Sequence, residues 1–119
     1  MDTTVGQIIV QKGWGYEKWI TNNEKYCGKL LFFEKGKRCS WHYHLVKDEV
    51  FYIHSGRIEL VYGLTDDKKE STRLILEQGD SFHVPVGLRH QMMGLEETEL
   101  FEFSTQHVEA DSIRVEKGD

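Results

Sequence analysis

The sequence predicts an all-β protein built as a small antiparallel β-barrel, and two observations lead to this fold class. Short runs of β-branched, aromatic and aliphatic residues recur along the chain, each about as long as a typical strand. Turn signals rich in glycine, one of them holding the only proline, separate these runs, and no segment has a sustained helical period. Regularly spaced strands of this kind are typical of a sandwich or a barrel, and closure protects the sheet edges.

The expected strands follow one another at short intervals along the chain. They contain residues 30–33, 50–53, 58–62, 74–76 and 100–103. The polar segment 64–71 separates two of these strands, so we expect it to form an exposed hairpin loop.

Composition limits the classes of function. The chain has 119 residues and a formal net charge of -5, and we expect one domain over residues 1–119. The acidic balance argues against a nucleic-acid partner, because phosphate binding needs a basic surface. No apolar run approaches the roughly 18 residues of a membrane span, so we expect no membrane partner. The first residues lack the pattern of a targeting signal, which predicts a cytoplasmic protein.

The stretch from Gly36 to Gly56 carries the first candidate metal ligands. His42 and His44 are two residues apart, and such residues point to the same face of a strand, so both imidazoles can reach one ion. A polar reversal follows them, after which Glu49 opens a new strand. From there its carboxylate can reach the same point.

The stretch from Gly79 to His90 supplies the fourth candidate. Pro85 fixes its own φ and Gly87 can adopt positive φ, so together they predict a tight corner before the strand that carries His90. Three imidazoles and one carboxylate suit manganese, iron, nickel or zinc. With six-coordinate geometry, two positions stay open for water or substrate.

These two stretches resemble the paired sequence motifs of the cupin superfamily. The first motif, G(x)5HxH(x)4E(x)6G, matches from Gly36 to Gly56. The second, G(x)5PxG(x)2H(x)3N, matches from Gly79 to His90, with Gly94 in place of the final asparagine. The resemblance implies a double-stranded β-helix, or jelly roll, and a metal site made of His42, His44, Glu49 and His90. The missing asparagine is not a metal ligand in the family, so its loss concerns packing at the strand end.

Three flanking segments are similar to the cupin region of mannose-6-phosphate isomerases, especially the type fused to GDP-mannose pyrophosphorylase. These segments are residues 14–17, 102–105 and 111–114. The resemblance implies a sugar or sugar phosphate as the small-molecule substrate, and aldose–ketose isomerisation or epimerisation as the reaction. Two other functions stay open: an iron-dependent cupin dioxygenase and a non-catalytic sugar-binding module.

An isomerase needs a base that moves a proton between two carbons. The candidates for this catalytic role are Lys29 and Glu102. Glu102 alternates with Phe101 and Phe103, so it points away from the metal if these aromatic side chains line the interior, which is the arrangement we expect. Strand parity also predicts a largely apolar pocket lining. Alternatively, its apolar members belong to the barrel core and line no pocket. This lining consists of Ser40, Phe51, Ile53 and Met92.

Three aromatic residues have the opposite parity and are expected on the outer faces of their strands. They are Trp41, Tyr43 and Tyr52. Exposed aromatic surface of this kind favours burial against a second copy of the chain, so the sequence predicts a homodimer.

Overall fold

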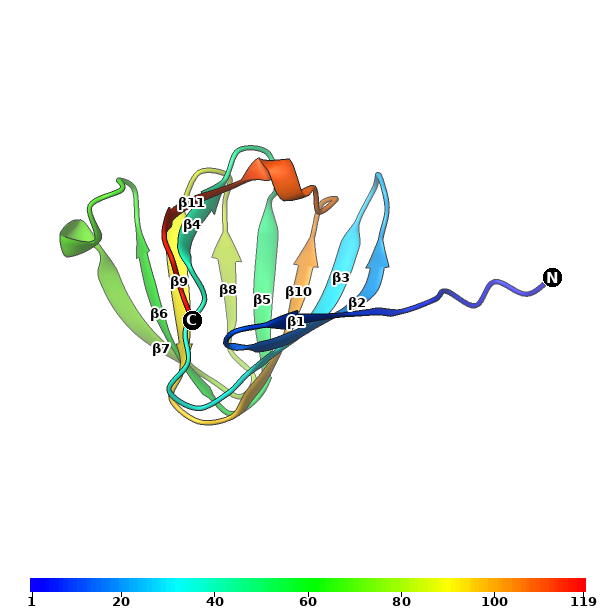
Figure 1. Ribbon diagram of the computed structural model, residues 1–119, viewed down its shortest axis with the longest axis horizontal. Coiled ribbons are helices and arrows are strands. Elements are labelled where there is room, and N and C mark those ends of the chain that lie inside the picture. Colours follow the sequence, from blue (N-terminus) through cyan, green and yellow to red (C-terminus); the bar gives the residue numbers. More distant parts are fainter.

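The computed structural model describes residues 1–119 and contains eleven strands, two short 3₁₀ helices and no α-helix (Figure 1). One sheet has six strands in the order β1 (Ile8–Lys12), β2 (Gly15–Asn22), β3 (Cys27–Phe33), β10 (Thr98–Ser104), β5 (Glu49–Ser55) and β8 (Ser81–Val84). The other has five, in the order β11 (Ser112–Glu116), β4 (Trp41–His44), β9 (Arg89–Gly94), β6 (Arg57–Gly63) and β7 (Thr72–Glu77). None of the helices has the length and apolar character of a membrane span.

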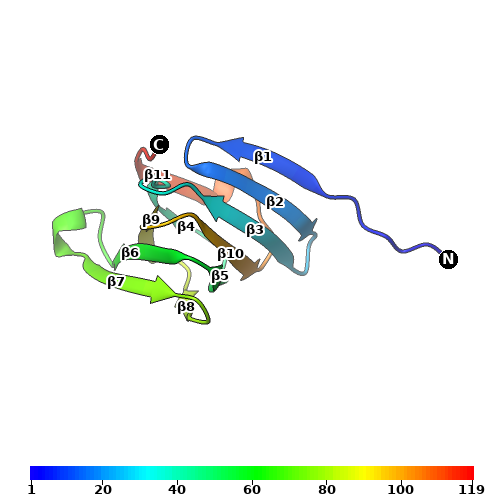
Figure 2. The same ribbon diagram turned by 90° about the horizontal axis from the view of Figure 1, so that it is seen from below.

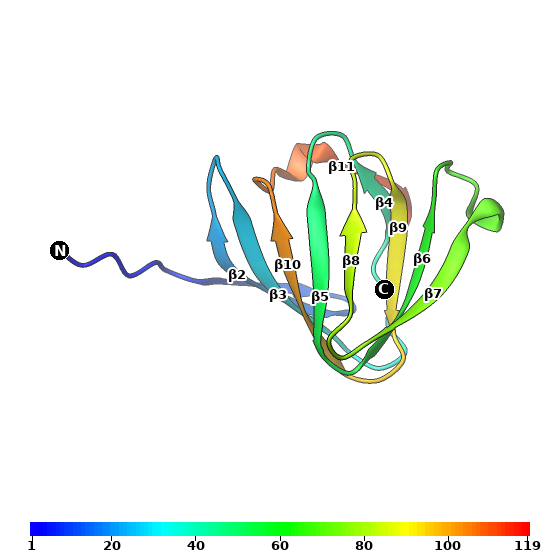
Figure 3. The same cartoon turned by 180° about the vertical axis from the view of Figure 1, so that it is seen from behind.

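The two sheets curve around a common interior, so the predicted all-β jelly-roll fold is confirmed (Figures 2 and 3). The expected closure is wrong in one respect, because no strand ladder joins the sheets. From β3 onward, most connections cross from one sheet to the other, which separates strands that are neighbours in sequence. Each sheet therefore keeps two open edges, and the barrel is held together by its core and its crossing connections.

All five predicted runs lie within strands, namely β3, β5, β6, β7 and β10. The segment 64–71 joins β6 to β7, which pair as an antiparallel hairpin, and it contains the 3₁₀ helix η1 (Lys68–Glu70). Strands β1, β2 and β8 were not predicted, because their mixed polarity gives no clear apolar run. Residues before β1 form an extended arm that projects away from the barrel (Figure 1).

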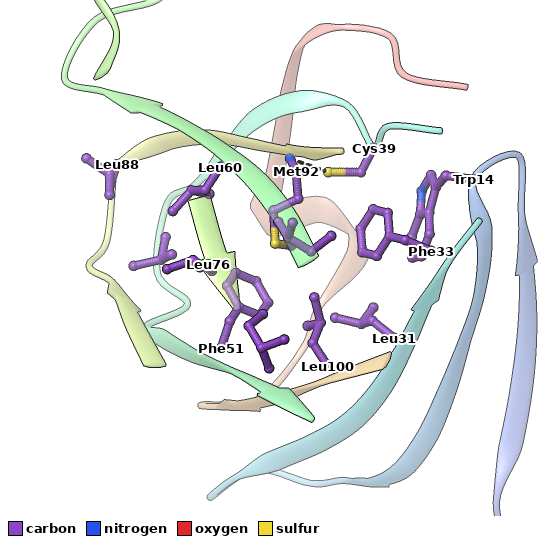
Figure 4. Close-up of a cluster of buried hydrophobic side chains, with 13 residues drawn as sticks. Trp14, Leu31, Phe33, Cys39, Phe51, Leu60, Leu76, Leu88, Met92 and Leu100 are labelled. Carbon is purple, nitrogen blue, oxygen red and sulfur yellow. Dashed lines mark hydrogen bonds between the residues drawn. The ribbon is translucent and has the colours of Figure 1, made fainter. Parts of the chain in front are cut away.

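The hydrophobic core contains 13 buried residues and fills the space between the sheets (Figure 4). At one end of this core, the rings of Trp14 and Phe33 stack with their centroids 4.2 Å apart. Along β3, every second residue faces the interior, so Leu31 packs inward with Phe33. The same alternation carries polar side chains inward at other strand positions, among them the candidate ligands His42, His44 and His90.

The four motif glycines have a left-handed backbone conformation that residues with a Cβ rarely adopt. All four have φ between +81° and +92°: Gly36, Gly56, Gly79 and Gly87. Gly94, which replaces the motif asparagine, packs against backbone, since a Cβ there would lie 2.8 Å from the carbonyl oxygen of Glu34. The glycine thus permits close contact at this strand end.

The expected exposure of Trp41 is wrong, because its side chain is completely buried. The loop after β6 covers this ring, and the indole Nε1 donates a hydrogen bond to the carbonyl oxygen of Asp66 at 3.0 Å. Tyr43 lies under the guanidinium of Arg89, whose Cζ is 3.7 Å from the ring centroid. Only Tyr52 remains exposed, at 37%. The homodimer stays a prediction, and Trp41 no longer supports it.

Candidate metal centre

Three histidines converge on the interior face of the five-stranded sheet. His42 and His44 lie on β4, and His90 lies on β9 directly opposite His42 in the antiparallel register. One nitrogen of each ring lies within 4.8 Å of the others. The corner that precedes β9 is tied to β4, because the backbone nitrogen of Gly87 donates to the carbonyl oxygen of His44 at 3.0 Å. We call His42, His44 and His90 the histidine wall.

Backbone carbonyls fix the orientation of two of these rings. Nδ1 of His42 lies 2.9 Å from the carbonyl oxygen of Ser40, and Nδ1 of His90 lies 3.0 Å from that of Leu88. Each Nδ1 must carry the proton in order to donate these bonds, so Nε2 keeps its lone pair. Histidine ligands of metals are usually oriented in this way by a second hydrogen bond.

Glu49 opens β5 and brings its carboxylate from the opposite sheet to the histidine wall. Its Oε2 is 3.1 Å from Nε2 of His44 and 3.4 Å from Nε2 of His90. Glu49 Oε2, His90 Nε2 and His44 Nδ1 are buried and have no hydrogen-bond partner. Buried polar atoms rarely lack partners, and lone pairs that face one another need a cation between them. The four residues therefore fit a divalent metal.

The protonation states favour the same conclusion. Burial, together with the neighbouring His90 ring, lowers the pKa of His42 well below its ordinary value. Burial alone would raise the pKa of Glu49, but contacts with His44 and His90 and the charge of Lys47 hold it well below its ordinary value. A neutral imidazole and an ionised carboxylate are the forms that bind metal ions.

Asp111 connects the metal site to a distant part of the chain. It ends the 3₁₀ helix η2 (Glu109–Asp111), and its carboxylate accepts hydrogen bonds from the backbone nitrogens of Val46 at 2.6 Å and Lys47 at 3.0 Å. Its Oδ2 also lies 3.5 Å from Nδ1 of His44. Asp111 therefore holds the loop between two ligand-bearing strands and faces the ring of one ligand. No such role was predicted for Asp111, because no local spacing links it to that loop.

The histidine wall and Glu49 line one end of a cavity of about 320 Å³. Ser40, Phe51 and Met92 line it as predicted, whereas Ile53 lies in the hydrophobic core outside the lining. The expected apolar character is wrong, since only 6 of the 24 lining residues are hydrophobic. Inward-facing strand positions here carry lysine and glutamate as well as aliphatic side chains.

The opposite side of the cavity carries paired charges, which we call the charged wall: Glu17, Lys29, Lys47 and Glu102. Lys47 Nζ lies 3.0 Å from Glu102 Oε2 and 3.5 Å from Glu49 Oε1, while Lys29 Nζ lies 3.2 Å from Glu17 Oε1. Lys29, Lys47 and Glu102 are each at most 4% exposed. Charges buried so deeply need such pairing. Sequence analysis did not identify Lys47, because loop positions have no periodicity.

The expected orientation of Glu102 is wrong. Phe103 is 56% exposed on the outer face, so the alternation along β10 turns Glu102 inward. There it lies in a row between Lys29 of β3 and Phe51 of β5, its register partners on either side. Both sequence-derived candidates for the base, Lys29 and Glu102, therefore line the cavity.

The remaining histidines and the cysteines lie outside the metal cluster. His83 pairs with Asp48 at the surface at 2.7 Å, and His54 packs against an aromatic ring of β10. His107 lines the cavity, with Nδ1 3.2 Å from Nζ of Lys47. Cys27 and Cys39 are buried free thiols, and burial raises the pKa of Cys39 to about 12.

The end of the described chain lies at the cavity mouth. The backbone nitrogen of Asp119 donates to the carbonyl oxygen of Arg38 at 2.9 Å, and Asp119 Oδ2 accepts from the backbone nitrogen of Arg38 at 2.8 Å. Gly118 packs on the backbone of Arg38 and Cys39, where a Cβ would collide. Both Gly118 and Asp119 are part of the cavity lining.

Comparison with solved structures supports the fold. The capsular polysaccharide assembling protein CapF from Staphylococcus aureus is 15% identical, with a TM-score of 0.80 over 97% of this chain and 36% of that chain. Oxalate decarboxylase from Bacillus subtilis is 19% identical, with a TM-score of 0.78 over 91% of this chain and 30% of that chain. The present chain thus spans about a third of the length of these proteins. No curated protein sequence matches it.

The Cupin domain family model matches residues 29–104, which is more than half of the chain and includes all four candidate ligands. The chain belongs to the cupin family.

Proposed function

We propose that this cupin binds a divalent first-row transition metal through His42, His44, Glu49 and His90, and isomerises or epimerises a sugar derivative. The observation that carries the proposal is the meeting of three histidines and Glu49 at a cavity whose opposite side is charged. The similarity to mannose-6-phosphate isomerases suggests the class of substrate. The structural neighbour CapF is a capsular polysaccharide assembling protein, so this fold also serves a sugar-related protein.

The charged wall suits a ligand rich in hydroxyl groups. Buried lysine and carboxylate side chains offer both hydrogen-bond donors and acceptors, as adjacent sugar hydroxyls require. An apolar ligand that filled the cavity would displace water from the remaining donor and acceptor positions of these groups without replacing its hydrogen bonds, at a cost in free energy. The wall therefore favours a polyol over an aromatic or aliphatic substrate.

Glu102 is the better candidate for the residue that moves the proton. Its Oε2 accepts hydrogen bonds from Lys47 at 3.0 Å and Ser104 at 2.9 Å, which fix the carboxylate and leave Oε1 without a protein partner. Lys29 is engaged instead with Glu17 and lies over the ring of Trp19, 4.5 Å from its centroid. A metal ion bound at the histidine wall supplies Lewis acidity toward carbonyl and hydroxyl oxygens of the substrate.

The test is turnover. We expect the manganese-loaded protein, incubated in D₂O with free and phosphorylated aldoses, to exchange the proton at C2 and form the ketose or epimer, followed by NMR. Glu102→Gln is expected to lower the rate by about 100-fold or more, the usual contribution of a positioned base. Glu99→Gln, on the outer parity of the same strand, is the matched control and keeps the rate.

Three results would contradict this function. One is the absence of exchange and product across the whole panel. Another is oxygen consumption by the iron-loaded protein, which would indicate a dioxygenase. Tight sugar binding without any turnover would indicate a sugar-binding module.

A further inference from the structure

We propose that the cavity mouth contains an anion subsite centred on Arg114, so that the ligand carries a phosphate or carboxylate group. The inference rests on the proposed function in one respect only, namely that the ligand occupies the cavity next to the metal ligands. Beyond the proposed function, the inference specifies that the ligand is negatively charged and that Arg114 recognises this charge.

The strand register places Arg114 beside the metal site. On β11, Arg114 pairs with His42 and Ser112 pairs with His44. Residues that pair directly across two strands point to the same side of a sheet, so Arg114 and Ser112 face the interior together with the two ligands. Both belong to the cavity lining. Arg114 is exposed to solvent, so it lies on the open side of the cavity, which we call the mouth.

The ion pairs around the cavity leave this arginine free. Every carboxylate side chain of the lining accepts a hydrogen bond or forms an ion pair, namely Glu17, Glu49, Glu102, Glu109 and Asp119. Of the basic residues in the lining, Lys29 and Lys47 are paired as described above. The other three, Lys12, Arg114 and Lys117, have no carboxylate within 4.0 Å.

The charge balance of the cavity follows from this inventory. Five basic and five acidic side chains line it and cancel formally, so a bound divalent ion brings the lining to +2. The carboxylates already have hydrogen-bond or ion-pair partners, whereas Lys12, Arg114 and Lys117 have no carboxylate partner. A neutral ligand would leave these positive charges unpaired, whereas an anionic group would pair with them.

Arginine is the residue best suited to such an anion. Its planar guanidinium presents parallel N–H groups that match the oxygens of a phosphate or carboxylate. A ligand whose hydroxyl oxygens face the histidine wall and the charged wall would direct its anionic group outward to Arg114, with Lys12 and Lys117 on the same lining.

The experiment measures anion binding directly and needs no turnover. Zinc-loaded, ¹⁵N-labelled protein is titrated with inorganic phosphate and, separately, with acetate, and binding is followed on the backbone N–H signals of the cavity-lining residues, which every variant retains. We expect Arg114→Gln to weaken binding of the preferred anion about tenfold, as expected for loss of a charge-assisted hydrogen bond. The better-bound probe distinguishes a phosphate ligand from a carboxylate ligand.

Two further variants control the measurement. Arg73→Gln removes an exposed arginine of the same sheet that pairs with Glu59 outside the cavity, and it leaves binding unchanged. Arg114→Lys keeps the charge but loses the planar fork, so it weakens binding less than Arg114→Gln does.

Equal affinity in the wild type and Arg114→Gln would overturn the subsite, as would the absence of binding by either probe. If anions bind only when zinc is present and Arg114→Gln has no effect, the anion is a metal ligand and the proposal is also wrong. Anion binding that depends on Arg114, in a protein that turns over no sugar, would refute the proposed function and leave the subsite standing.

Discussion

The histidine wall comes from the five-stranded sheet, whereas the charged wall comes from the six-stranded sheet and the loop before β5. On the charged wall every cation is paired with a carboxylate. At the histidine wall, by contrast, Nε2 of His90 and Oε2 of the adjoining Glu49 have no hydrogen-bond partner. The cations of the charged wall thus have partners within the protein, whereas the histidine wall has buried polar atoms that lack one.

The difference shows where an external cation belongs. Both walls contain fully buried side chains, so burial alone does not distinguish a metal site from a structural ion-pair network. The distinguishing feature is the set of unpaired lone pairs, because only an additional cation removes their desolvation cost. Removing a paired cation of the charged wall should therefore act mainly on stability, and variants of the histidine wall mainly on metal affinity.

The largest expected effect is on the charged wall. Lys47→Met leaves Glu102 as a buried carboxylate without its ion-pair partner, and it should lower the free energy of unfolding by about 3–5 kcal/mol. Urea denaturation of the metal-free protein measures this change. The double variant Lys47→Met/Glu102→Leu should recover much of the loss, because it also removes the Glu102 carboxylate that Lys47 neutralised. A double variant as unstable as the single one would show that the pairing is not the cause.

At the histidine wall, His90→Ala removes one of four ligands. We expect metal affinity to fall by at least about 100-fold, beyond the usual effect of changing a residue that only supports a ligand. Competition with a chelating dye gives the affinity. The control is His83→Ala, which removes a surface histidine and should retain the metal. Retention of one equivalent of tightly bound metal by His90→Ala would place the ion elsewhere.

A smaller effect should follow from Asp111→Asn. This change weakens the support of the loop at Val46 and Lys47 and places an amide near Nδ1 of His44, so metal affinity should fall about tenfold. The absorption spectrum of the cobalt-loaded protein should shift, since the His44 ring is no longer held in the same orientation. Asp67→Asn is the control, because Asp67 also accepts a backbone hydrogen bond but lies in the hairpin loop. An unchanged cobalt spectrum would restrict Asp111 to a role in folding.

The smallest expected effect concerns an exposed ion pair. The Arg57–Glu77 distance, 3.2 Å, equals that of Lys29–Glu17, but the side chains of Arg57 and Glu77 are 44% and 61% exposed. Glu77→Gln should change the free energy of unfolding by less than about 1 kcal/mol, because water screens such pairs. Urea denaturation again provides the value. A loss comparable with that of Lys47→Met would mean that distance, and not burial, determines the effect.

The metal centre could be predicted because its information is local. His42 and His44 share a strand face through their spacing, and the glycine and proline turns around Glu49 and His90 set the strand starts. The fold class was predictable from the same alternation and turn chemistry.

The charged wall depends on information that is not local. Alternation along β10 separates Glu102 from Phe101 and Phe103, but it does not say which face is inside, and we chose the wrong one. We expected Trp41 to be exposed, because the loop that covers it comes more than 20 residues later in the sequence and no local pattern indicates that contact. Contacts of this kind depend on tertiary packing, which strand periodicity does not encode.

The position of Gly118 and Asp119 at the cavity mouth has a practical consequence for purification. A polyhistidine tag fused after Asp119 would start at the cavity lining and bring competing imidazoles toward the metal site. A tag fused before Met1 would instead start at the far end of the extended arm, away from the barrel (Figure 1). The second kind of fusion keeps the imidazoles of the tag away from the protein's own ligands, and cleaving the tag before metal analysis removes its contribution.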